Sequence, residues 1–196
     1  MCSSDLWWVL RSAEIPRAAL REYAAKRVLK VEEEGERVIL YGEGWRLEVG
    51  RNYSAWICEE PALHEGILAV RAGPPPPGAV TAMGASFLQS LLQRAMVEMC
   101  GTDPGAGGEL QMVAVGERVF DATHTMIATD PALIRQHVGP ELQKLLQEWP
   151  KGLDVPDFVW WRNGLRLVII GPLRKGPETV EALVETGQRV KALLHR

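Results

Sequence analysis

The dipeptide Asn163-Gly164 lies between two apolar runs, residues 158–162 and 165–170. Asn-Gly favours the two-residue turns whose backbone twist matches that of paired strands. We therefore expect an antiparallel hairpin in which Trp160 faces Leu167. An antiparallel sheet is the element around which the rest of this chain has to fold.

Earlier in the chain, short alternating segments are broken by glycine or proline. With a tight turn at Glu34-Gly35, Val31 would face Val38 and Glu32 would face Arg37, which gives one apolar and one charged side. Trp45, Leu47 and Val49 alternate with charged residues in the same way. The expected strands of this half are residues 30–34, 37–41, 45–49, 53–58 and 67–71.

Helical spacing of apolar residues is strongest in residues 80–100, which carry few charges. A core helix is the better interpretation of this segment, and a helix that binds a partner or a membrane surface is the alternative. Asp130 precedes Pro131 as a cap precedes a helix. Strands are expected at residues 110–115 and 118–128, and further helices at residues 15–29, 131–138 and 140–149 and from Gly176 onward.

These elements predict an α+β fold, an antiparallel sheet with helices packed on one face. The order of strands followed by a helix occurs twice, so two similar lobes are a further interpretation. The expected segments are residues 7–73, with the first helix and strands, residues 74–108, with four prolines, a helix and a glycine-rich loop, and residues 109–196, a ββα-ββα unit. Together they form one compact domain of 196 residues.

Composition limits the partners. The net charge of −3 gives no general attraction to nucleic acid or anionic lipid. The three cysteines, Cys2, Cys58 and Cys100, are odd in number and not closely spaced, which argues against a disulfide framework and fits a reducing, cytoplasmic compartment. No apolar run is long enough to span a membrane.

The first six residues, Met1 to Leu6, match the translated end of a common sequencing adapter, so we expect them to be foreign to the protein. The natural N-terminus would then be missing. Trp7-Trp8 ahead of Arg11 is typical of the end of a membrane span, although it is equally common at the start of a buried element. A missing upstream membrane anchor follows as an expectation.

The tryptophan pair Trp160-Trp161 is the best candidate for a binding surface. Neighbouring strand residues point to opposite faces, so Trp161 would share its face with Arg166, Val168 and Ile170. An exposed tryptophan stacked with an arginine beside apolar residues is typical of a contact patch. The alternative is that other parts of the chain cover this face.

An alternative is a metal site at Cys58, Glu60 and His64, because these are ligand types for zinc and similar ions. Glu59 and Glu65 are nearby, but the spacing matches no defined site. His124 could act as a general base, but Asp121 would point to the opposite face of a regular strand. We therefore assign no catalytic residue and expect no cofactor.

Four features carry a resemblance to known proteins: Ala24-Ala25-Lys26-Arg27 ahead of the first strands, residues 44–50, the Asp130-Pro131 helix pair, and the Asn163-Gly164 hairpin before a terminal helix. The chain is similar in these to an uncharacterised class of bacterial α+β domains of unknown function that are often tethered to membrane helices. The resemblance implies a cytoplasmic, membrane-associated protein and transfers no functional residues.

The leading interpretation is a non-enzymatic binding or interaction domain with a protein partner or a second copy of itself, and no nucleic acid. The alternative is a small metal-dependent hydrolase.

Overall fold

The computed structural model describes residues 17–74, 97, 109–173 and 175–195 of the chain. Nine strands form one antiparallel sheet in the order β1-β2-β3-β4-β9-β8-β5-β7-β6, and the α+β class predicted from the sequence is confirmed. The strands are β1 (Lys30–Glu34), β2 (Arg37–Gly42), β3 (Trp45–Val49), β4 (Tyr53–Cys58), β5 (Ile67–Ala72), β6 (Gln111–Val113), β7 (His124–Ala128), β8 (Asp157–Trp161) and β9 (Gly164–Ile170).

The two halves of the chain join inside this sheet. β4 pairs with β9, and β5 pairs with β8, so the C-terminal hairpin lies between strands of the N-terminal half. The described helices are α2 (Arg17–Arg27), α4 (Arg118–Thr123), α5 (Pro131–His137), α6 (Pro140–Gln147) and α7 (Gly176–Leu194).

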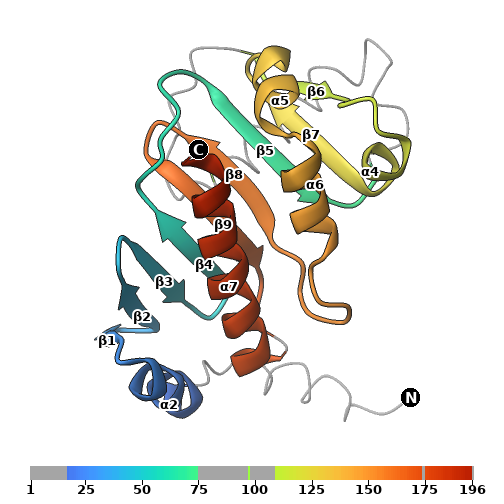
Figure 1. Ribbon diagram of the computed structural model, residues 1–196. Coiled ribbons are helices and arrows are strands. Elements are labelled where there is room, and N and C mark those ends of the chain that lie inside the picture. Colours follow the sequence, from blue (N-terminus) through green and yellow to red (C-terminus); the bar gives the residue numbers. More distant parts are fainter. Residues whose placement is uncertain (1–16, 75–96, 98–108, 174, 196) are drawn as a thin grey trace, which may run out of the picture.

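The helices pack on one face of the sheet, where α7 runs across its centre and α6 lies beside it (Figure 1). Trp56, Leu167 and Phe158 form the centre of the core on this face, together with the apolar side of α7. Gly187 allows α7 to approach closely, because a Cβ at this position would overlap the ring of Trp56. The main core is therefore the layer between the sheet and its helices.

The opposite face of the sheet carries a second, smaller apolar cluster. Its buried members come from five strands and from the segment before β6: Ala55, Ile57, Ile67, Ala69, Leu110, Ile127, Val159, Trp161 and Val168. Both faces of β8 are consequently buried, and every residue of that strand is classed as buried.

Both tight hairpins form, but each register differs from the expected one by two residues. Val31 faces Leu40 and not Val38, because Gly35 is the first turn residue, with φ 57°, and Glu36 the second. In the same way Trp160 faces Leu165, because the β8–β9 turn is made by Arg162-Asn163. The faces stay as predicted, since a shift of two residues preserves the alternation.

Residues 118–128 do not form one strand, and that prediction was wrong. Residues 118–123 form α4, and β7 begins at His124. The Glu117 side chain caps this short helix by accepting a hydrogen bond from the backbone N–H of Phe120. Asp121 holds the preceding loop by accepting hydrogen bonds from the amides of Val115 and Gly116, each at 3.0 Å.

The remaining helix predictions hold for the residues that the structure describes. α2, α5, α6 and α7 lie within the expected ranges, and Asp130 caps α5 by accepting a hydrogen bond from the N–H of Ala132 at 2.8 Å. The expected helix over residues 80–100 lies outside the described residues, except for Val97, which is helical. The adapter-like start and the rest of the proline run also lie outside them.

Candidate functional site

The structure differs in one respect from the contact patch that the sequence predicted around Trp161. Trp161 lies on the same face as Arg166 and Val168, as predicted, but its side chain is 1% exposed and belongs to the second apolar cluster. The prediction of an exposed tryptophan was therefore wrong. The alternative, in which this face is covered, agrees with the burial of Trp161. β8 lies inside the sheet, between β9 and β5, and its side chains belong to the buried clusters on both faces.

Arg166 forms the predicted cation–π contact. Its guanidinium carbon lies 5.1 Å from the centre of the Trp161 ring. The Nε atom of Arg166 is buried and has no hydrogen-bond partner within the described part of the chain. The Trp161–Arg166 stack thus lies on the second face of the sheet, where Trp161 belongs to the apolar cluster.

Val168, the third residue of the predicted patch, is buried and lines a cavity of about 540 Å³ at the end of this face. Three segments meet there: the end of β5, the loop that leads into β8, and the end of β9. We call this cavity the Asp157 pocket. Its walls consist of Arg71, Ala72, Gly73, Asp154, Val155, Asp157, Val168, Ile169, Ile170, Gly171 and Pro172.

Asp157 is the most perturbed ionisable group of this pocket. Its side chain is only 11% exposed, and its Oδ1 lies 3.7 Å from the Nε of Arg71, which is longer than a hydrogen bond. Burial raises the pKa of the Asp157 carboxyl to about 6, and the nearby Arg71 charge offsets this only in part. A carboxyl with a raised pKa inside a pocket is typical of a functional site.

The mouth of the Asp157 pocket is apolar and open. Val155 is 48% exposed and Ile170 is 47% exposed, which is unusual for large aliphatic side chains in this protein. Gly73 and Gly171 both have a positive φ, and a Cβ on either would meet no other atom within 4 Å. Exposed apolar side chains beside a charged pair are characteristic of the surfaces through which proteins bind partners.

The residues of the metal alternative are not brought together. The Cys58 thiol points into the protein, where it donates to the carbonyl oxygens of Gly44 and Glu60, at 3.0 and 2.7 Å. His64 is exposed. Within the described ranges, no group of three or more His, Cys, Asp or Glu side chains is placed to hold a metal ion.

His124 and Asp121 do not form a catalytic pair. The ring of His124 stacks on Phe120 with centroids 4.2 Å apart, and its Nδ1 lies 3.0 Å from the Thr123 hydroxyl. Burial lowers the pKa of His124, so the ring is held in its neutral form. Asp121 instead binds backbone amides, as described above, so both side chains have structural roles.

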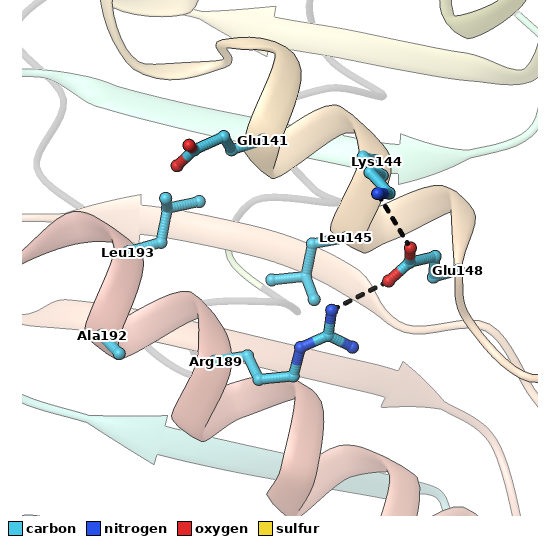
Figure 2. A pocket seen from close by; sticks show the side chains of 7 residues that line it. All are labelled: Glu141, Lys144, Leu145, Glu148, Arg189, Ala192 and Leu193. Carbon is cyan, nitrogen blue, oxygen red and sulfur yellow. Dashed lines mark hydrogen bonds and ion pairs between the residues drawn. The ribbon is translucent and has the colours of Figure 1, made fainter.

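A second hollow lies between α6 and α7 (Figure 2). Its charges satisfy one another, because Glu148 pairs with Arg189 at 2.8 Å and with Lys144 at 3.8 Å. Leu145 and Leu193 line the groove between these charges. Lys144, Glu148 and Arg189 are thus paired with one another, and exposed ion pairs of this kind contribute little to stability.

A third hollow, beside the β2–β3 turn, is lined by Trp45, Arg46, Glu59 and Lys191. Its arginine is also paired, with Glu59 at 3.1 Å and with Glu48 at 2.9 Å. The Asp157 pocket differs from both hollows, because its central charge is buried and only weakly paired. It is therefore the strongest candidate site in the described part of the chain.

Sequence reasoning missed Arg71 and Asp157. The two residues are far apart in the chain and meet only because β5 pairs with β8, next to the partners Val70 and Phe158. One signal was present, since Asp157 is a charged residue at the head of an otherwise apolar strand. Its significance depends on burial, which the sequence pattern does not give.

Comparison with known proteins identifies a shared fold. No family model matches this chain, and no curated protein matches it by sequence. The structure is similar to the crystal structure of the mycobacterial trehalose monomycolate transport factor A, TtfA, with a TM-score of 0.54 and 9% identity over 89% of this chain and 91% of the other. At this identity the likeness extends to the fold alone.

None of the described helices is both long enough and apolar enough to cross a membrane.

Proposed function

We propose that this chain is a non-enzymatic binding domain that serves a membrane transport assembly, on the cytoplasmic side, and that it contacts its partner through the Asp157 pocket. The observation that carries the proposal is the likeness to a transport factor over nearly the full length of both chains. The resemblance of the sequence to membrane-tethered bacterial domains points in the same direction.

The pocket supports a role in binding. It combines a half-exposed cation, Arg71, a buried carboxyl, Asp157, and two exposed aliphatic side chains, Val155 and Ile170. Protein contacts are commonly built in this way, with an apolar centre for affinity and a few charges for specificity. Cys58 and His124, two residues considered from the sequence, have structural contacts inside the fold, with backbone carbonyl groups and with Phe120.

Photo-cross-linking in the host cell tests the proposal. A photoreactive phenylalanine analogue would replace Ile170 in the full chain, and cross-linked proteins would be identified by mass spectrometry. The matched control is the same analogue at Val28, which is 93% exposed at the end of α2 and equally apolar. Helix α2 packs on β1, β2 and α7.

We expect a membrane transport protein to be captured from position 170 and not from position 28. The proposal would be overturned if the Ile170 variant is expressed normally and captures only soluble enzymes, or captures the same proteins as the Val28 variant.

A further inference from the structure

Among the residues that the structure describes, no donor lies within hydrogen-bond distance of the Asp157 carboxylate. An ionised carboxylate accepts up to about four hydrogen bonds. The described contact is the ion pair with Arg71, which at 3.7 Å is longer than a hydrogen bond. The side chain is only 11% exposed, so a donor brought in by a ligand would form a charge-assisted hydrogen bond in a poorly solvated place.

The lining of the pocket combines apolar side chains with this carboxylate. Val155 and Ile170 are about half-exposed, and Asp157 is buried. Open space over Gly73 and Gly171 leaves room for an incoming group. The cavity of about 540 Å³ is large enough for a single long side chain.

We propose that the Asp157 pocket receives a lysine side chain of the partner protein, with the aliphatic stem against Val155 and Ile170 and the ammonium group at the Asp157 carboxylate. This inference rests on the proposed function, because it names the chemistry of the partner at the same site. Lysine side chains commonly lay an apolar stem along an apolar surface and place the charge at its end.

The negative charge of Asp157 favours a cationic group over an acidic or an apolar group in this pocket. An acidic group would have to come close to the buried carboxylate, and two like charges in a poorly solvated pocket repel strongly. A purely apolar group would displace water and leave the carboxylate without a donor. An ammonium group supplies three donors and the opposite charge.

Arg71 does not block this arrangement. Its side chain is 51% exposed, so water and salt screen its charge from an incoming ammonium. Its long contact with Asp157 leaves the other carboxylate oxygen free of that contact, and a compact ammonium fits beside it more easily than a second planar guanidinium.

Titration with three six-carbon probes tests the inference. Hexylamine, hexanol and hexanoate are linear six-carbon molecules that end in a cation, a neutral hydroxyl and an anion. Each would be added to the isotope-labelled full chain at about pH 7.5, where Asp157 is ionised, and followed by the amide signals of Val155, Asp157 and Ile170 in NMR spectra.

We expect hexylamine to bind saturably and about tenfold more tightly than hexanol, since a charge-assisted hydrogen bond is the difference between them. Asp157→Asn should reduce hexylamine to the affinity of hexanol. Val155→Ser should weaken both probes and keep their ratio, which provides a second variant if the first folds poorly. Glu148→Gln, in the groove of Figure 2, should change nothing.

Three results would overturn the inference: equal binding of hexylamine and hexanol, preferred binding of hexanoate, which would make Arg71 the anchor, or no binding of any probe. None of these affects the cross-linking result from Ile170, so the inference can fail while the proposed function stands. If cross-linking fails and hexylamine binds, the pocket chemistry holds and the transport role does not.

Discussion

Replacing Asp157 with asparagine is expected to stabilise the protein at neutral pH. The native carboxyl has a pKa of about 6, against an ordinary value of 3.8 in an exposed chain, and burial is the main cause. A raised native-state pKa means that the folded protein holds its proton more tightly than the unfolded chain. The contribution of Asp157 to stability is therefore most favourable below pH 3.8 and is lost as the pH rises through about 6.

The size of the effect follows from this difference. Ionising Asp157 in the native state lowers the free energy of unfolding by about 3 kcal/mol at about pH 7.5, and by about 1 kcal/mol at about pH 4.5. Asparagine has nearly the same shape and no charge. Because Arg71 is half-exposed, it is hydrated after the substitution and adds little cost.

Urea unfolding followed by tryptophan fluorescence, at several pH values between about 4.5 and 7.5, measures the difference between the two proteins. We expect the advantage of Asp157→Asn to grow by about 2 kcal/mol across this range. Glu36→Gln is the matched control, since Glu36 is exposed in the β1–β2 turn, and its effect should stay flat. The reasoning is refuted if the Asp157→Asn difference does not change with pH, or if the variant is the less stable protein at neutral pH.

Four further outcomes are expected. Gly187→Ala should cost about 2 kcal/mol or more, measured by urea unfolding, because the added methyl group overlaps the ring of Trp56. Trp161→Ala should cost about 3 to 5 kcal/mol in the same assay, since the ring is buried, and a loss below about 1 kcal/mol would show that this face is not packed. Asp130→Ala should lower stability by about 1 kcal/mol through loss of the α5 cap, and loss of that helix alone should be visible in amide exchange. Burial raises the pKa of Tyr53 to about 12, so an ultraviolet absorbance titration of the folded protein should show Tyr53 ionising well above pH 10, and Tyr53→Phe should remove that step.

Sequence periodicity predicted most of the described elements because local physics dominates there. β3 alternates between buried and half-exposed residues, from Trp45 to Val49, as its sequence implies. The caps of α5 and the apolar stripe of α7 were equally visible. Helix α4 was not predicted, because its six residues carry no apolar stripe at helical spacing. The side chains of Glu117 and Asp121 hold this helix in place.

The hairpin registers show what local rules leave out. Asn163-Gly164 predicts a turn, but Gly164 is the first residue of β9 and has a φ of 98°. A Cβ at Gly164 would overlap the carbonyl oxygen of Cys58 on the neighbouring strand. This glycine is therefore required by a close approach between strands, which depends on the pairing of β4 with β9 and is not encoded in the turn itself.

The candidate site was predictable in part, and the missing part follows from burial. Arg166 and Val168 were placed on the correct face by alternation alone, and Val168 leads to the pocket. Asp157 gained its importance only when β5 and β8 came together and removed it from water. A buried carboxylate that lowers stability at neutral pH has no structural advantage over asparagine, whose shape is the same. Proteins commonly tolerate such costs where binding or chemistry requires them, so a buried charge at Asp157 is in keeping with the binding role proposed for the pocket.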